Sequence, residues 1–536
     1  MGKIIETQIS RWDGGITNDP RDPRASVATV ITNFDILTDP HRLIPYYGSE
    51  DGDSSSSNNK IHNFCIAKLS ATATAIYGLG RSTSGTDRSK VFYRDISSDL
   101  ADATWSSHDS AKSESSADSS AATESELFVY YENQNRIYMA DIYNDKIMAY
   151  DPSGATNWDE TTALTMTHVT NGIVHSKDDI CYFAYYNSAD GTSGIYKKDG
   201  ASAWAAISTT FPKNFRPTVI REYGNYIAIG GEIYSPTAVG FNGSIVYIWD
   251  RDSTLETLSE SIYWGDDRLM VMDEINGTLI GISFTTGTAR FKPRITFRYY
   301  SVGEAIEFFT LTPTKATGTP DMTFRSQKIN NKLCFLLEAQ IDGEGRDGIW
   351  SVSGRPGDFK IVHERTPNND TAITNSTSSL VGFYFVGDYC FISRNDNGTY
   401  AMTKTNDAET YVASSIHEKL FRSGGSSLKK DLIGATVETE PMSANGQIIL
   451  KYKIDHNTSW TTIFTDTTDN SLSHSAINIE SSGAALPKDY KEISFRIEST
   501  GGAVITGFNF MEEITGKRVY MALFEAIIRW GKSLIK

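Results

Sequence analysis

The sequence lacks the features by which several classes of protein are recognised. Only 4 of its 536 residues are cysteine, which is too few for a disulfide framework in a chain of this length. It contains no apolar run of about 18 residues, the length that a membrane-spanning helix needs, and its first fifteen residues lack the apolar core of a signal peptide. We therefore expect no membrane span and assembly in a cytoplasm.

Positive charge is also scarce. The chain has 50 Lys and Arg against 66 Asp and Glu, so its formal net charge is -16. A negative protein is repelled by the phosphates of nucleic acids and by anionic membranes. We expect no nucleic-acid partner.

Motifs for catalysis and for cofactors are absent as well. The nine histidines show no zinc-binding spacing, "GLGRSTSG" (78–85) lacks the lysine of a phosphate-binding loop, and no G-x-S-x-G occurs. "SRNDNGTY" (393–400) approaches the S-x-D-x-G-x-T-W box of sialidase-like propellers, but Ser393 and Thr399 are each displaced by one position relative to Asp396 and Gly398. We expect no metal and no cofactor, and we name no catalytic residue.

Aromatic residues and glycine are abundant, and they follow a repeat. The 27 Tyr, 25 Phe and 42 Gly favour many short strands joined by tight turns. Each cysteine follows a polar stretch and one apolar or aromatic residue, and three further stretches fit the same frame. This first landmark falls at Phe64, Ile137, Ile180, Tyr226, Leu279, Leu333 and Tyr389. The cysteines are then small buried residues at a repeat position.

A second landmark follows the first in every unit. It falls at Tyr93, Tyr150, Tyr196, Trp249, Phe297, Trp350 and Tyr400. The long first interval contains a Ser-rich segment (106–126) with almost no apolar residues, which reads as a loop insertion. Seven such units predict an all-β fold with a seven-bladed β-propeller over 51–425. The alternatives are a β-sandwich or a β-helix array.

The pattern changes after Lys430. Six short segments of alternating apolar and polar residues predict strands near 434–442, 447–455, 460–466, 473–481, 491–499 and 504–513. We expect a small jelly-roll-like β-sandwich over 431–514.

The two ends differ from the rest of the chain. Residues 1–50 are expected to form an extended arm that either completes the ring or lies over a neighbouring subunit. Residues 515–536 predict a short amphipathic helix that docks on its own chain or a neighbour, with a membrane-surface segment as the alternative. Candidate docking residues are Leu523, Phe524, Ile527, Ile528 and Trp530.

The phrases "SRWDGGI", "ITNFDI" and "RLIPY" in the arm and "KYKIDHNTSWTTIF" in the last domain resemble virion proteins of tailed bacteriophages, in particular neck, tail-hub and tail-associated propeller proteins. The resemblance implies a non-enzymatic structural component of the virion, assembled in the host cytoplasm. It also implies a homo-oligomeric ring that binds other virion proteins through the arm, the propeller edges and the tail.

Two other functions are compatible with the same architecture. One is an adhesin that binds host surface glycans, for which Trp460 is a weak candidate contact. The other is a glycoside hydrolase or lyase with its site in the central channel of the propeller, which would need two carboxylates close together. With 66 acidic residues, the sequence cannot single out a pair.

Overall fold

The structure of the chain is a computed structural model. It describes residues 3–19, 22–51, 59–82, 89–96, 105–108, 127–141, 146–153, 159–163, 166–207, 211–234, 241–252, 258–265, 267–285, 292–314, 326–329, 331–341, 343–366, 379–387, 389–396, 399–405, 411–422, 428–455, 457–477 and 486–514.

The described residues are nearly all in β-strands and turns, which confirms the predicted all-β class. A single 3-10 turn, η2 (Glu132–Gln134), is the helical element within these ranges, and none of their helices is long and apolar enough to cross a membrane. The chain divides into two compact units. Unit 1 comprises Met1–Gly48, Lys360–Arg365 and Ala408–Lys536, and unit 2 comprises Ser49–Phe359 and Thr366–Asp407.

Unit 2 contains seven antiparallel sheets, which follow one another along the chain. The first is β6 (Asn59–Lys68), β7 (Thr74–Ser82), β8 (Ser89–Asp95) and β9 (Ser106–His108), and the second is β10 (Phe128–Tyr131), β11 (Arg136–Asp141), β12 (Lys146–Tyr150) and β13 (Asp159–Ala163). In the third, β14 (His168–Val169) and β15 (Ile173–His175) both pair with β16 (Ile180–Asn187), followed by β17 (Thr192–Asp199) and β18 (Ala205–Ile207).

The remaining sheets keep this order. The fourth is β19 (Phe215–Tyr223), β20 (Tyr226–Tyr234), β21 (Phe241–Trp249) and β22 (Glu260–Gly265). The fifth is β23 (Arg268–Ile275), β24 (Thr278–Thr285), β25 (Arg294–Ser301) and β26 (Glu304–Pro313), extended by β29 (Ala339–Ile341) and β30 (Glu344–Gly345). The sixth contains β27 (Ser326–Ile329), β28 (Lys332–Leu337) and β31 (Gly348–Ser353), and the seventh is β33 (Ser379–Val386), β34 (Tyr389–Asp396), β35 (Thr399–Thr405) and β5 (Ser49–Asp51).

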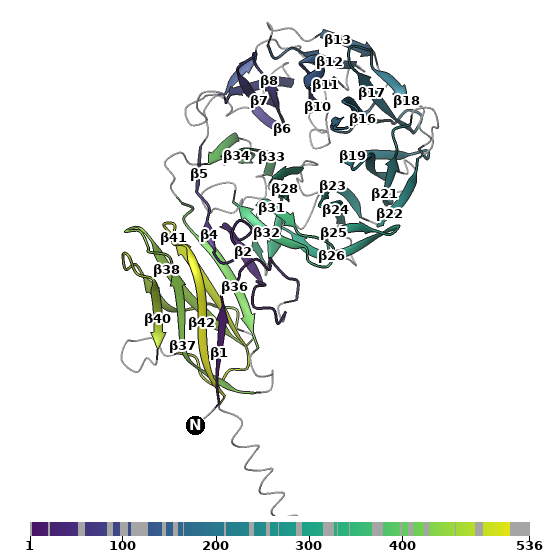
Figure 1. The fold of residues 1–536 in the computed structure, drawn as a ribbon. Helices are drawn as coiled ribbons and strands as arrows, with labels where there is room; N and C mark the ends of the chain where they lie inside the picture. The colour runs from purple at the N-terminus through teal and green to yellow at the C-terminus, as the bar shows by residue number, and fades with distance from the viewer. Residues whose placement is uncertain are drawn as a thin grey trace, which may run out of the picture. The chain divides into compact units, whose positions relative to one another are not determined.

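These sheets are arranged around a common centre (Figure 1), and β6, β10, β19, β23 and β33, each the first strand of its sheet, lie nearest to it. The ring is closed in two ways. β33 of the last sheet contacts β6 of the first, and β5, from the N-terminal side, pairs with β35 as the fourth strand of the last sheet. Closure of this kind lets the sheets at the two ends of the series pack against each other.

The sequence landmarks map onto this arrangement. All seven second landmarks lie on the third strand of a sheet. The first landmarks lie on second strands, except Phe64, which lies with Cys65 on the first strand β6. In the first unit, the first landmark was therefore placed one strand too early. The cysteines were expected to be buried at one repeat position. Cys181, Cys334 and Cys390 are buried on second strands, whereas Cys65 is only partly buried and lies on β6.

The apolar core of unit 2 lies between consecutive sheets. Tyr77 and Val91 of the first sheet pack with Phe128 and Tyr150 of the second, and the same happens around the ring, including the last sheet against the first. Burial of side chains that face each other across sheets is the main source of stability in such an array.

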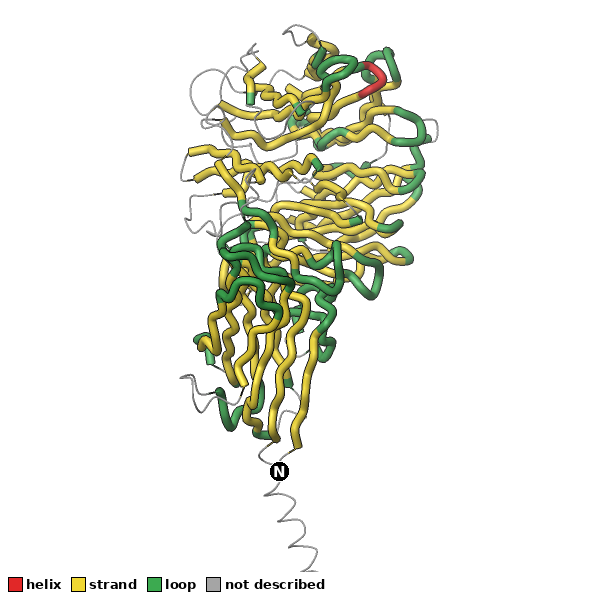
Figure 2. The backbone as a smooth tube through the Cα atoms, turned by 60° about the vertical axis from the view of Figure 1, so that its left-hand side comes forward, coloured by secondary structure: helices red, strands yellow, loops and turns green. Residues whose placement is uncertain are grey.

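Unit 1 contains two sheets (Figure 2). One has the order β1 (Lys3–Ile9), β42 (Ile505–Ile514), β37 (Lys430–Thr439) and β40 (Ser473–Ile477). The other contains β32 (Lys360–Arg365), β2 (Val30–Thr32), β36 (Ser415–Phe421), β41 (Ile493–Thr500), β38 (Gln447–Ile454) and β39 (Thr461–Asp466), and a small pair is formed by β3 (Phe34–Asp35) and β4 (Ile44–Pro45). All six strands predicted after Lys430 are confirmed.

The two sheets of unit 1 pack through aromatic side chains. Phe421 and Phe495 come from one sheet, and Phe508 and Phe510 come from the other, with ring centroids 4.8 to 6.4 Å apart. Most of the segment expected to be an extended arm folds within this unit, where β1 pairs with β42 along its whole length.

Two predicted segments fall largely outside the described residues. The predicted helix at 515–536 lies wholly outside them. Of the predicted Ser-rich loop, Ser106–His108 forms the strand β9, so the insertion begins later than expected, and 109–126 is not described.

Candidate functional site

A cavity of about 530 Å³ lies in unit 2 among the strands nearest the centre of the ring. Strands from five consecutive sheets line it: β10, β15, β19, β23 and β27. Its charged lining residues are Arg221, Glu222, Asp273, Glu274 and Lys328. The cavity therefore combines three carboxylates with two cations, and its volume is in the range of small-ligand sites.

Several of these residues occupy one repeated position. On each of the five strands, one residue is paired with a residue of the second strand of the same sheet, and that partner is the first landmark of the unit or its neighbour. These residues are Tyr130 (paired with Ile137), His175 (Ile180), Glu222 (Ile227), Glu274 (Leu279) and Lys328 (Leu333). We call them the inner-strand row. The repeat places them at one level around the centre, and all except His175 line the cavity directly.

Asp273 is held by cations and a hydroxyl. Arg221 Nε lies 3.2 Å from its Oδ2, and Ser326 Oγ donates to the same oxygen at 3.0 Å. Lys328 Nζ lies 3.8 Å from Oδ1. Because its charge is already neutralised, Asp273 is suited to holding β19, β23 and β27 together rather than to chemistry.

Glu274 is held by backbone groups. Gly224 N–H, in the turn between β19 and β20, donates to Glu274 Oε2 at 3.1 Å, and Gly277 N–H donates to Oε1 at 3.2 Å. Hydrogen bonds from two N–H groups stabilise negative charge on a carboxylate. Within the described residues no ion pair neutralises Glu274, and its side chain lines the cavity.

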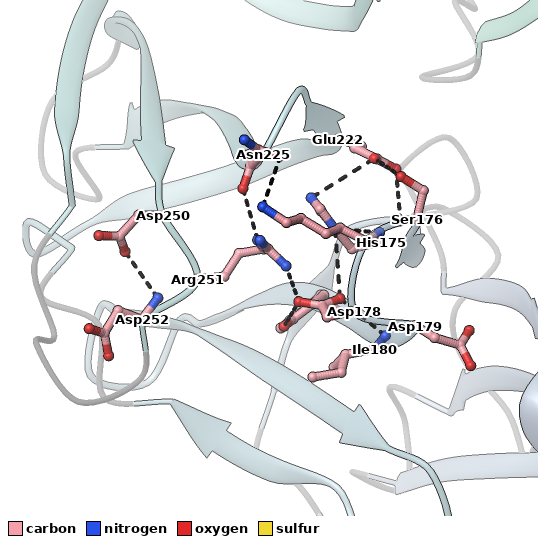
Figure 3. A network of polar contacts seen from close by, with 12 residues as sticks. His175, Ser176, Asp178, Asp179, Ile180, Glu222, Asn225, Asp250, Arg251 and Asp252 are labelled. Atoms are coloured by element: carbon pink, nitrogen blue, oxygen red, sulfur yellow. Dashed lines mark hydrogen bonds and ion pairs between the residues drawn. The ribbon is translucent and has the colours of Figure 1, made fainter.

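Glu222 is held by the turn that follows β15 (Figure 3). Ser176 N–H donates to Glu222 Oε2 at 3.2 Å, and the Ser176 hydroxyl donates to Oε1. His175 Nε2 lies 3.9 Å from Glu222 Oε1. Glu222 thus has hydroxyl, amide and imidazole neighbours, all from the preceding sheet.

A second set of charges lies at the opposite ends of β19 and β23. Glu232 lies between Arg216 (Nη1 to Oε1, 3.6 Å) and Arg268 (Nε to Oε2, 3.3 Å), and Arg298 Nη2 lies 2.9 Å from Asp267 Oδ2. Both carboxylates are buried and each faces arginine, which is typical of structural ion pairs. We therefore place the candidate site at the cavity.

The site residues predicted from sequence lie elsewhere. Leu523, Phe524, Ile527, Ile528 and Trp530 are outside the described residues, so their docking role stays a prediction. Trp460 is partly buried in unit 1 just before β39, with Lys453 Nζ and Arg496 Cζ each 4.6 Å from its ring centroid. Its expected role as a glycan contact also stays a prediction.

The sequence carried a signal for the inner-strand row that we did not use. In the third, fifth and sixth sheets the row residue stands five positions before the first landmark, and in the fourth it stands five before Ile227, the residue after the landmark Tyr226. Reading this offset gives His175, Glu222, Glu274 and Lys328. Across the described residues, no group of three or more His, Cys, Asp or Glu is arranged to hold a metal ion.

Comparison with known proteins found similarity only among solved structures, since no family model and no curated protein matches the chain. An exo-β-1,3-galactanase from Phanerochaete chrysosporium is 9% identical, with 87% of this chain and 100% of that chain covered and a TM-score of 0.30. A mutant Trypanosoma rangeli sialidase with trans-sialidase activity is 8% identical, with 95% of each chain covered and a TM-score of 0.29. An oligogalacturonate lyase is 8% identical, with 66% and 99% covered and a TM-score of 0.39.

These matches correct the leading functional prediction. They are carbohydrate-active enzymes and not virion components, which contradicts the expected structural role in a tail or neck, and that role is not proposed again. Their low TM-scores assign no activity and no residue to this chain. The resemblance to phage proteins, the homo-oligomeric ring, the virion partners and the virion location stay untested predictions.

Proposed function

We propose that this chain is a glycoside hydrolase whose active site is the cavity of unit 2, with Glu222 and Glu274 as its two carboxylates. The observation that carries the proposal is their placement. They occupy the same ladder position on the adjacent inner strands β19 and β23, and both line one cavity.

The proposal includes a finer description of the fold. We propose that the seven sheets of unit 2 are the blades of a seven-bladed β-propeller and that the two sheets of unit 1 form a β-sandwich. In a propeller the inner strands of neighbouring blades converge on the central channel. Side chains from different blades can then act on one substrate although they are about 50 residues apart in the chain.

Two carboxylates on opposite sides of a glycosidic bond are sufficient for its hydrolysis. One, as the carboxylic acid, gives its proton to the leaving oxygen as the bond from that oxygen to the anomeric carbon breaks. The other either takes a proton from the water that attacks the anomeric carbon or attacks that carbon itself before water releases the sugar. In both routes one water is consumed and the first carboxyl recovers its proton.

The other lining residues suit a sugar. Tyr130 offers an aromatic surface for the apolar face of a pyranose ring. Lys328, whose side chain is 52% exposed, can donate to hydroxyl or carboxylate oxygens. Arg221 and Asp273 neutralise each other, so the cavity does not require a substrate of one particular charge.

The test is turnover on a panel of neutral and acidic oligosaccharides, followed as new reducing ends, for the wild type and for Glu222→Gln and Glu274→Gln. We expect each variant to lose activity roughly 10²- to 10⁴-fold, the usual contribution of acid–base catalysis. Glu304→Gln, at an exposed carboxylate on β26, is the matched control and should keep full activity.

Two results would overturn the proposal. One is turnover that survives both cavity substitutions. The other is binding of an oligosaccharide without any turnover by the wild type, which would instead favour the glycan-binding adhesin.

A further inference from the structure

His175 is a buried histidine that the two-carboxylate scheme does not use. Its side chain is 0% exposed, although it belongs to the inner-strand row and follows the cavity-lining Ile173 and Val174. A buried imidazole with no role is costly, because each ring nitrogen needs a hydrogen-bond partner.

The backbone fixes the tautomer of this imidazole. Lys177 N–H donates to His175 Nδ1 at 3.2 Å, so Nδ1 acts as an acceptor and the proton of the neutral ring lies on Nε2. Among the described residues, Nε2 has no hydrogen-bond partner within 3.5 Å, and Glu222 Oε1 lies 3.9 Å from it (Figure 3). The Nε2–H group is thus directed at the carboxylate.

The charges around His175 come from two directions. Glu222 on β19 faces Nε2, and Asp178, in the turn after β15, has its Oδ1 3.6 Å from Nδ1. Asp178 is also bound by Arg251, which follows β21, and by the Tyr182 hydroxyl of β16 at 3.2 Å. Arg251 therefore offsets the charge of Asp178, and Glu222 is the carboxylate that His175 can stabilise.

We infer that His175 is a positioning residue for Glu222: its Nε2–H faces Oε1 and, with the Ser176 groups, fixes the orientation of that carboxyl group in the cavity and stabilises the carboxylate left after Glu222 gives up its proton. The inference deepens the proposed function and rests on it. Glu274 is held instead by the backbone N–H groups of Gly224 and Gly277.

The proton balance of this pair is simple. Glu222 gives its proton to the leaving oxygen and becomes a carboxylate, which Nε2–H and the Ser176 groups then stabilise. It is protonated again by the water that enters the reaction, and His175 keeps its own Nε2 proton throughout. No oxidant, reductant or further reactant is needed.

The first part of the test does not depend on activity. With ¹⁵N-labelled histidine, we expect the His175 signals of the wild-type chain to report a ring that is protonated on Nε2. In Glu222→Gln the Nε2 chemical shift of His175 should change, whereas in Glu274→Gln it should not. A ring protonated on Nδ1, or an Nε2 shift indifferent to Glu222, would overturn the inference whether or not the chain hydrolyses glycans.

The second part uses the substrate found in the oligosaccharide panel. His175→Gln should lower kcat at least about tenfold, a part of the usual acid–base contribution, with KM within about twofold, and should change the pH profile of kcat. Glu304→Gln, at the exposed carboxylate on β26 outside the cavity, should leave that profile unchanged. If the pH profile of kcat is unaltered in His175→Gln while the wild type turns over normally, the inference is wrong and the proposed function is unaffected.

Discussion

The inner-strand row of unit 2 and a charged cluster in unit 1 both contain lysine and glutamate, but these residues have different roles in the two regions. In unit 1, Lys430 on β37 and Glu512 on β42 are both 0% exposed, with Nζ 3.9 Å from Oε1. Tyr490 donates its hydroxyl to Glu512 Oε1 at 2.8 Å. Burial raises the pKa of Glu512 and lowers the pKa of Lys430.

The difference between the two regions is access to solvent. Lys430 and Glu512 are buried on neighbouring strands of one sheet, so their pairing stabilises the fold. Glu222, Glu274 and Lys328 line a cavity, and their hydrogen-bonding partners leave part of each side chain available. A charged cluster therefore indicates a functional site only when it lines a space that a substrate can enter.

The largest expected effect is on stability in unit 1. Lys430→Met should lower the free energy of unfolding by about 3 to 5 kcal/mol, because it leaves Glu512 buried without its cation. Lys328→Met, in the cavity, should change it by less than about 1 kcal/mol. Chemical denaturation of the full chain measures both. Equal losses in the two variants would remove the contrast between the regions.

The second prediction concerns acid. Burial, together with the nearby Lys419, lowers the pKa of His417 from 6.5 to about 3. Between these values the unfolded chain binds a proton at this histidine and the folded chain does not. Stability should therefore fall as pH falls from about 6.5 to about 3, by up to about 1.4 kcal/mol per pH unit.

His417→Phe should flatten that slope, because phenylalanine cannot bind the proton and can keep the edge contact with Trp12, whose ring centroid is 4.9 Å away. The measurement is the free energy of unfolding at several pH values. An unchanged slope in the variant would show that other groups control the acid response of unit 1.

The smallest effect is expected for the Arg221–Asp273 pair beside the cavity. A double-mutant cycle with Arg221→Met and Asp273→Asn should give a coupling energy of about 1 to 3 kcal/mol, since both side chains are largely buried. The exposed Lys429–Asp489 pair is the control and should give less than about 1 kcal/mol. A coupling as small as the control would argue that Asp273 is available for chemistry.

The sequence alone determined the β class, the six strands after Lys430 and the placement of the second landmark, because strand and turn preferences are local and the core between sheets demands apolar residues at a regular interval. It misassigned the first unit, where Phe64 lies on a first strand, because one apolar strand resembles another when its neighbours are unknown.

Only the tertiary structure decided the site. Each member of the inner-strand row is unremarkable in its own segment, and His175, Glu222 and Glu274 stand about 50 residues apart. They become neighbours because β15, β19 and β23 converge on one centre. Charge proximity is a property of that closed ring, and local sequence preferences do not encode it.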